Sequence, residues 1–406
     1  MNQDQPIHPG PLHDIRVLDL SRVLAGPFAA MTLGDMGAEV IKVEQPGSGD
    51  SLRTLGEEKN GAALFWLQES RNKKTLACDL RDPEGQEIIR RLVANGFDIV
   101  FENFRPGTLE RWGLGYEDLR KANRGVIMVR ISGYGQTGPA RNLPGFGRTA
   151  HAFGGLTYLS GFPDRPPANP GSATIADYAA GLFAAYGALT AVEHRNATGE
   201  GQIIDVALYE ALFRIMDNLA VTYSANGTVR ERMGSATPLA APHNHYPTAG
   251  GRWIAIACTN DRIFARLAEL MGKPELASDQ RFNSARRRVA NRDAIDQLVS
   301  DWTGAQDMDE LVDRLNQAEV PCSPIYSIAD IFKDPQYLAR EALIEVEHAS
   351  AGRIKMPAVV PRLSHSPGQV RWLGRALGED TDALLGEKLG MSREQLAGLR
   401  ERGVIA

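Results

Sequence analysis

Several features that would assign a function directly are missing from this chain of 406 residues. Its three cysteines, Cys78, Cys258 and Cys322, are scattered and form no CxxC pair, so neither a disulfide framework nor a metal site is predicted. The apolar segment 178–192 is too short and too rich in Ala and Gly for a membrane span, so no membrane association is expected. A net charge of −5 argues against nucleic acid as a partner.

Two further motifs are absent. The first fourteen residues, MNQDQPIHPGPLHD, have no basic segment followed by an apolar one, so we expect no signal peptide and a cytoplasmic location. The first predicted loop between a strand and a helix offers only Ala-Gly-Pro (25–27) where dinucleotide-binding proteins carry GxGxxG. A nicotinamide or flavin dinucleotide is therefore not supported.

The order of the predicted elements is typical of an α/β protein. Strands are expected at 15–19, 39–43, 99–101, 126–131, 202–207 and 253–257, and helices at 28–37, 83–95, 208–223 and 261–272. Residues 72–80 predict a basic turn followed by a further strand. This alternation predicts a doubly wound parallel sheet. The length predicts two domains. We assign 1–227 and 328–406 to a large domain and 228–327 to a smaller α/β domain, with glycine-rich loops expected at 133–147 and 233–251.

Residues 170–196, PGSATIADYAAGLFAAYGALTAVEHRN, predict a buried helix of small residues that lets another backbone come close. Thr174 suits the N-cap, and Asp177 stands three residues later, as the acid of a capping box would. From these residues alone, a capping carboxylate favoured by the helix dipole is the preferred interpretation of Asp177, ahead of a catalytic one.

Six stretches, in chain order, resemble the family III CoA-transferases, the group of formyl-CoA and dicarboxylyl-CoA transferases that includes carnitine CoA-transferase. They are LDLSRVLAGPFAAMTLGDMGAEVIKVEQPGSGD (18–50), NKKTLACDL (72–80), ENFRPGTLERWGLGY (102–116), ISGYGQTGP (131–139), TGEGQIIDVAL (198–208) and VPCSPIYSIADIFKDPQ (320–336). The resemblance implies a Rossmann-like large domain built from both termini, a smaller α/β domain, and an interlocked homodimer. It implies acyl-CoA and small carboxylic acids as substrates, with no tightly bound cofactor and no metal.

The resemblance also changes the interpretation of Asp177, which matches the family's nucleophilic aspartate. A carboxylate nucleophile suits CoA transfer, because the mixed anhydride and the aspartyl-CoA thioester that it forms both conserve the thioester's energy. A place in the first helical turn is expected to keep this carboxylate ionised.

The CoA contacts are likewise expected from the resemblance. Leu24 and Ala25 match backbone contacts to the nucleotide, and Gln45 stands where some members have a phosphate-binding Arg. The remaining expected CoA contacts are Arg71, Asn72, Lys73, Asn103, Phe104 and Arg111.

The acyl group is expected near Phe146, His151, His243 and Asn244, with His245 carrying the same ambiguity as His243. A histidine beside Asn244 would suit the second carboxylate of a dicarboxylic acyl group. Succinyl-CoA is the expected donor, and a C4 or C5 dicarboxylate the expected acceptor.

Two alternatives stay open at this point. A 2-methylacyl-CoA racemase needs a base on each face of the α-carbon. Its histidine would fall at Phe146, which cannot carry a proton, although His151 leaves this alternative some room. A non-catalytic acyl-CoA binding protein would keep the CoA contacts but would not need Asp177.

Overall fold

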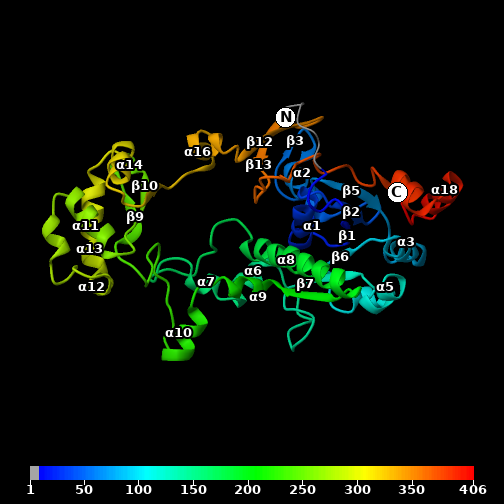
Figure 1. Ribbon diagram of the computed structural model, residues 1–406, viewed down its shortest axis with the longest axis horizontal. Coiled ribbons are helices and arrows are strands. Elements are labelled where there is room, and N and C mark those ends of the chain that lie inside the picture. Colours follow the sequence, from blue (N-terminus) through cyan, green and yellow to red (C-terminus); the bar gives the residue numbers. More distant parts are fainter. Residues whose placement is uncertain (1–8) are drawn as a thin grey trace. The chain divides into compact units, whose positions relative to one another are not determined.

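The computed structural model describes residues 9–406 and divides them into two units (Figure 1). The large unit comprises residues 9–156, 171–219 and 341–406, and the small unit comprises 157–170 and 220–340. The small unit is thus longer at both ends than the expected range 228–327. It also includes 157–170, because Tyr158 donates its hydroxyl to the Glu231 carboxylate at 2.7 Å and accepts at its carbonyl from Arg232.

A six-stranded parallel sheet forms the centre of the large unit. Its strands are β1 (Arg16–Asp19), β2 (Glu39–Glu44), β5 (Lys73–Ala77), β6 (Ile99–Glu102), β7 (Ile127–Ser132) and β8 (Ile203–Ala207). The order is β5-β2-β1-β6-β7-β8, which is 3-2-1-4-5-6 when only these strands are counted. This is the order of doubly wound sheets, whose ligands bind beyond the carboxyl ends of the strands where the order reverses. Here the reversal lies between β1 and β6.

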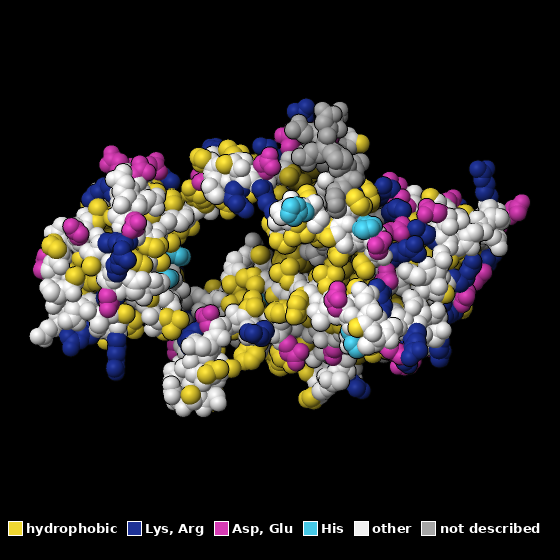
Figure 2. Space-filling model, viewed as in Figure 1, with side chains coloured by type: hydrophobic (Ala, Val, Ile, Leu, Met, Phe, Trp, Pro, Cys, Tyr) yellow, Lys and Arg dark blue, Asp and Glu magenta, His cyan; other side chains and the backbone are white. Residues whose placement is uncertain are grey.

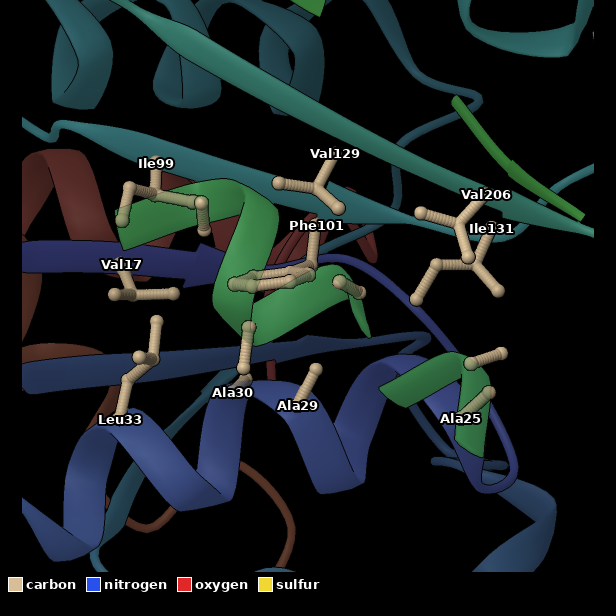
Figure 3. Packing of buried hydrophobic residues seen from close by; sticks show 14 of the residues in the cluster. Val17, Ala25, Ala29, Ala30, Leu33, Ile99, Phe101, Val129, Ile131 and Val206 are labelled. Atoms are coloured by element: carbon tan, nitrogen blue, oxygen red, sulfur yellow. The ribbon is translucent and has the colours of Figure 1, made fainter. Parts of the chain in front are cut away.

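Alternate residues of these strands face two different layers of helices. Val17 packs with α1 (Ala25–Asp35) and α8 (Ile175–Thr198), whereas Leu18 packs on the opposite face. Figure 3 shows side chains of α1 pointing towards those of the strands. The helices that contribute to the opposite layer are α3 (Pro83–Ala94), α5 (Tyr116–Ala122), α17 (Thr381–Leu389) and α18 (Arg393–Glu401).

Small residues bring α8 against α1, as the sequence predicts. A Cβ on Gly181 would lie 2.7 Å from Cδ1 of Phe28 and 2.8 Å from the carbonyl oxygen of Ala25. The expectation that this apolar segment is too short for a membrane span is wrong, because α8 continues over 24 residues. It is the one helix among residues 9–406 that passes a membrane-span test of length and composition, and 44% of the tested window is buried in the protein.

The large unit contains several shorter elements. They are η1 (Ser51–Thr54), β3 (Glu58–Lys59), β4 (Ala62–Ala63), α2 (Leu64–Glu69), α4 (Thr108–Arg111), α6 (Gly147–Phe153), α9 (Leu208–Arg214), β12 (Leu343–His348) and β13 (Gly352–Pro357). The single helix expected at 208–223 is wrong: α9 ends at Arg214, and the chain turns at Asp217, whose φ is +47°. β12 and β13 pair as a hairpin, and their buried side chains pack with those of α2.

The small unit is built on a three-stranded antiparallel sheet of β9 (His243–Pro247), β10 (Trp253–Ala257) and β11 (Cys322–Pro324). The expected loop at 233–251 is therefore wrong in its second half, because 243–247 pairs with β10. The helices of this unit and its borders are α7 (Leu156–Leu159), α10 (Leu219–Asn226), η2 (Ala249–Gly251), α11 (Asp261–Leu270), η3 (Pro274–Ala277), α12 (Ala285–Ala290), α13 (Arg292–Gly304), α14 (Met308–Gln317), α15 (Ile328–Ile331) and α16 (Pro335–Ala339).

Candidate active site

Asp177 lies in the first turn of α8, where its backbone N–H donates to the carbonyl of Thr174 at 3.0 Å. Burial raises the pKa of its carboxyl to about 6, against the smaller lowering effects of His151, its own backbone N–H and the Thr174 hydroxyl. The helix start therefore does not hold this carboxyl in the usual acidic range. At neutral pH it is still mostly ionised, but it is an unusually basic carboxylate.

His151 caps α8 in place of Thr174. The Thr174 side chain makes no capping hydrogen bond to the helix backbone. Instead, Nε2 of His151 accepts from the backbone N–H of Ala176 at 3.0 Å, and the imidazole is 1% exposed. The expected capping box is thus replaced by a side chain from another helix, because the imidazole satisfies one of the orphan N–H groups of the first turn.

Gly147 begins α6 and lies directly against the Asp177 carboxylate. A Cβ at position 147 would stand 2.0 Å from Oδ2 of Asp177 and 3.3 Å from Cβ of Thr174. No side chain fits there, so glycine is required by the close approach of the two helices. Phe146, the residue before it, is 69% exposed.

A concave feature lies at the carboxyl ends of the central strands. Its cavity measures about 230 Å³, which is below the ~300–1,000 Å³ of pockets that enclose a whole drug-sized ligand, so it would hold part of a large ligand. The lining residues are Leu20, Arg22, Lys42, Val43, Glu44, Gln45, Ser48, Gly49, Asp50, Cys78, Leu80, Arg81, Phe104 and Trp112. We call this the strand-end pocket. It follows β1, β2, β5 and β6, at the reversal of strand order.

The walls of the strand-end pocket combine aromatic rings with arginines. Phe104 and Trp112 meet edge to face with ring centroids 5.2 Å apart. Arg22 and Arg81 are exposed at the rim, and the Arg81 guanidinium donates two hydrogen bonds to the Asp79 carboxylate. An aromatic surface with guanidinium groups beside it suits an adenine base and phosphates.

The floor of the strand-end pocket is an ionic network. Lys42 is buried and lies 3.0 Å from Asp50 and 3.9 Å from Asp19. Burial alone would raise the pKa of Asp50, but Lys42 and the backbone N–H groups of Leu52 and Val23 outweigh it and hold the pKa at about 2. This carboxylate is therefore charged at every physiological pH.

Two of the expected CoA residues, Gln45 and Phe104, line the strand-end pocket. Asn103 adjoins it, with its amide bonded to the backbone of Arg22. Leu24 precedes α1 and Ala25 begins it; both are buried outside the lining.

Arg71, Asn72 and Lys73 are buried and lie outside the lining as well. The Arg71 guanidinium contacts Asp35 at 2.6 Å, and the Asn72 amide donates to the same carboxylate at 2.7 Å. Lys73 contacts Asp19 at 2.9 Å. All three lie at or before the start of β5, whereas the pocket lies at the opposite end of the strands.

Arg111 is exposed on α4, where it donates to the Thr108 hydroxyl at 3.1 Å. Its neighbour Glu110 pairs with Arg130 instead. His243, Asn244 and His245 lie on β9 in the small unit, and the Asn244 amide donates to Asp296 at 3.0 Å.

Sequence reasoning missed Arg22, Arg81 and Trp112 in the pocket lining, and Gly147 beside Asp177. A signal for the two arginines was available, because each closely follows a predicted strand. Gly147 had no such signal, since only the packing of α6 against α8 places it there.

Comparisons with known proteins identify the family of this chain. The family model described as CoA-transferase family III matches residues 12–381. The chain is 48% identical to the succinyl-CoA–L-malate CoA-transferase alpha subunit of Chloroflexus aurantiacus, over 97% of this chain and 92% of that protein. It is 45% identical to the succinyl-CoA–D-citramalate CoA-transferase of the same species, over the full length of both. A crystal structure of a CaiB/BaiF family protein from Brucella suis is similar with a TM-score of 0.82 and 36% identity, over 93% of this chain and 99% of that one.

The match covers nearly the whole chain, and relatives at 45–48% identity are named CoA-transferases. The chain therefore belongs to CoA-transferase family III and is itself a CoA-transferase.

Proposed function

We propose that this enzyme moves CoA from succinyl-CoA to a free C4 or C5 dicarboxylate, with Asp177 as the nucleophile. The observation that carries the proposal is the carboxylate at the start of α8, whose pKa is raised to about 6 by burial. The donor and the acceptor class are supported by the names of the relatives, which act between succinyl-CoA and malate or citramalate.

In the proposed first half-reaction, a carboxylate oxygen of Asp177 attacks the thioester carbonyl and CoA leaves as the thiolate. The products are a mixed anhydride and CoAS⁻. The thiolate then attacks the aspartyl carbonyl, which gives an aspartyl-CoA thioester and releases succinate. The succinate carries away one oxygen from Asp177.

The second half-reaction reverses these steps with the acceptor. Its carboxylate attacks the aspartyl-CoA thioester, CoAS⁻ leaves, and a second mixed anhydride forms. The thiolate attacks the acceptor's acyl carbon, which gives the new acyl-CoA and regenerates Asp177. The regenerated carboxylate keeps one oxygen from the acceptor, and no proton or water is consumed.

The surroundings of Asp177 suit this chemistry. A carboxylate with a pKa near 6 is more basic, and so more nucleophilic, than an ordinary aspartate, while at pH 7 it is mostly deprotonated. Gly147 lets the backbone of α6 lie directly against the carboxylate, which limits the positions that the carboxylate can take. Burial limits the access of water to the anhydride and the thioester.

The nucleotide end of CoA is proposed to occupy the strand-end pocket. Phe104 and Trp112 offer a surface for adenine, and Arg22 and Arg81 offer charges for the phosphates. Gln45 also lines the pocket, at the position where some family members have a phosphate-binding arginine. Arg22 and Arg81 nearby offer the positive charge that Gln45 lacks.

We further propose that the working enzyme is an interlocked dimer of two copies. The support is an apolar surface on the large unit: Leu182 and Tyr186 on α8 are 56% and 70% exposed. Figure 2 shows hydrophobic side chains gathered over the region of the large unit that carries α8. Side chains of this kind at helical spacing are typical of a covered interface. Light scattering of the purified protein at the mass of one chain, 44.2 kDa, would contradict this assembly.

The activity is tested by incubating the enzyme with succinyl-CoA and each of several labelled free acids, including malate, citramalate and glutarate. Label that enters the CoA ester pool shows transfer. Deuterium lost from the α-carbon of a 2-methylacyl-CoA would show racemisation instead, and saturable binding without either would leave a binding protein. We expect transfer to a dicarboxylate and neither of the other results.

A further inference from the structure

A strained backbone segment forms one wall of the strand-end pocket. Val23 has φ = +66°, a left-handed conformation that a β-branched side chain rarely adopts. It lies in the segment Leu20–Leu24, which joins β1 to α1 and which we call the β1–α1 loop. Leu20 and Arg22 of this loop line the pocket, so the strained residue is a direct neighbour of pocket-lining residues in the chain.

The side chain of Asn103, which follows the end of β6, holds Arg22, the residue before Val23. Oδ1 of Asn103 accepts from the backbone N–H of Arg22 at 2.8 Å, and its Nδ2 donates to the carbonyl of Arg22 at 2.6 Å. The amide thus binds both backbone groups of a single residue, as a neighbouring strand would. Leu20 is tied to the same strand, because its N–H donates to the carbonyl of Phe101 at 2.9 Å.

A second side chain, from the loop after β2, holds Val23 itself. The Val23 N–H donates to both carboxylate oxygens of Asp50, at 3.0 and 3.2 Å. Asp50 in turn accepts from the N–H of Leu52 at 3.0 Å and contacts Lys42 at 3.0 Å. The partners of the Asp50 carboxylate are thus backbone N–H groups and the buried Lys42. All of them belong to the protein itself, so this carboxylate holds the loop in place without a ligand.

A conformation that is costly for its residue persists only where surrounding contacts over-determine it. Adjacent residues 22 and 23 are each held by a different side chain, from two strand ends that the sheet brings together. Building on the proposed function, we propose that Asn103 and Asp50 are positioning residues that hold the β1–α1 loop in its CoA-binding shape before CoA arrives. Neither role requires contact with the ligand.

Asn103→Ala removes one clamp with little risk to folding, because Asn103 is only half-buried. Without this side chain, Val23 is expected to relax to a less strained conformation and to move the loop out of its CoA-binding shape. Part of the binding free energy of CoA is then spent on restoring that shape, so the affinity falls. Glycine adopts a left-handed conformation freely, so Val23→Gly removes the conformational penalty at this position. That penalty corresponds to a factor of about ten or more in the equilibrium between the CoA-binding shape of the loop and other shapes. Val23→Gly should therefore restore what Asn103→Ala loses, whereas Val23→Ala, which keeps Cβ, should not.

The experiment measures the Kd of CoA for the full-length enzyme by calorimetry in Asn103→Ala alone and combined with each Val23 variant. We expect a loss of about tenfold for Asn103→Ala, recovery to within about threefold with Val23→Gly, and no recovery with Val23→Ala. An equal loss with and without Val23→Gly would overturn the proposal, because it would mean that Asn103 acts by touching CoA. No loss for Asn103→Ala would overturn it as well.

A second readout needs no ligand. Hydrogen exchange of the backbone amides at 20–25 should speed up in Asn103→Ala and slow again when Val23→Gly is added. If the wild-type enzyme bound no CoA, the proposed function would fail, but the exchange rates would still decide whether the clamp exists. Unchanged exchange at 20–25 in Asn103→Ala would refute the clamp while leaving the proposed function intact.

Discussion

Two aspartates of the large unit, Asp50 and Asp177, show how one residue type is given opposite properties. Both are largely withdrawn from water, and burial is the main upward influence on both pKa values. Asp50 has Lys42 and the N–H groups of Val23 and Leu52 as partners, and its pKa falls to about 2. Asp177 has no lysine or arginine partner among the influences on its pKa, which rises to about 6.

In the proposed mechanism Asp177 is the nucleophile, whereas Asp50 has a structural role. A carboxylate with every lone pair engaged is a poor nucleophile and a good anchor. A buried carboxylate without a positively charged partner, such as Asp177, keeps its electron pairs available for attack on a carbonyl carbon.

Asp177→Ala should abolish CoA transfer, with a loss on the order of 10⁴-fold or more in kcat, because it removes the proposed nucleophile. The measurement is the rate of acyl-CoA formation at saturating succinyl-CoA. The variant should remain folded with the same mass in solution, and its Kd for CoA should stay near that of the wild type. Turnover close to the wild-type rate would overturn the assignment.

Asp50→Asn should lower the free energy of unfolding by about 3–5 kcal/mol, because the buried Lys42 loses its nearest countercharge. Denaturant unfolding at pH 7 measures this. The matched control is Asp79→Asn. The pKa of Asp79 is about 2 as well, but this residue pairs with the exposed Arg81. That change should cost less than about 1 kcal/mol. Equal losses of unfolding free energy for the two variants would contradict the expected difference between the buried Asp50–Lys42 pair and the exposed Asp79–Arg81 pair.

Gly147→Ala should lower kcat by about 10²-fold, because the new methyl group would stand where Oδ2 of Asp177 lies and displace the carboxylate. The KM for succinyl-CoA should change little, since the strand-end pocket is built from other segments. Gly386→Ala on α17 is the control, because its Cβ meets nothing closer than 3.9 Å. If Gly147→Ala kept wild-type kcat, the close approach would have no bearing on catalysis.

The pH dependence should give the smallest effect. Since the pKa of Asp177 is raised, the carboxyl is protonated below about pH 6, and kcat should fall about tenfold per pH unit below that point. A raised acid pKa also means that the ionised group destabilises the fold as pH rises through 6. Asp177→Asn should therefore increase the free energy of unfolding at pH 8 by up to about 2 kcal/mol, and change it little at pH 4. A gain of equal size at both pH values would contradict this account.

The strands of the central sheet and the helix with Asp177 were predictable because they depend on local apolar runs and on small-residue composition. The strand β9 was not, since His243–Pro247 has no apolar alternation and is held by pairing with β10. The cap of α8 was assigned to Thr174 from sequence distance, whereas His151 is 25 residues away and reaches Ala176 only through helix packing. Local patterns predict elements, but the partners of a polar group depend on which elements meet.

The same limit explains the pKa of Asp177. The helix start predicted an ionised carboxylate, because the dipole effect can be inferred from the sequence. The opposing effect of burial depends on α6 lying against the carboxylate, which no neighbouring residue in the chain reveals.

The most direct test of the central claim follows the oxygen atoms. The enzyme is incubated with succinyl-CoA and a dicarboxylate acceptor labelled with ¹⁸O in its carboxylates, and is then digested and examined by tandem mass spectrometry. Asp177 and Glu193 share one tryptic peptide, so fragment ions are needed to separate them. We predict ¹⁸O in the side chain of Asp177 after turnover and none in Glu193. Turnover with Asp177 free of ¹⁸O would contradict a covalent role for this residue.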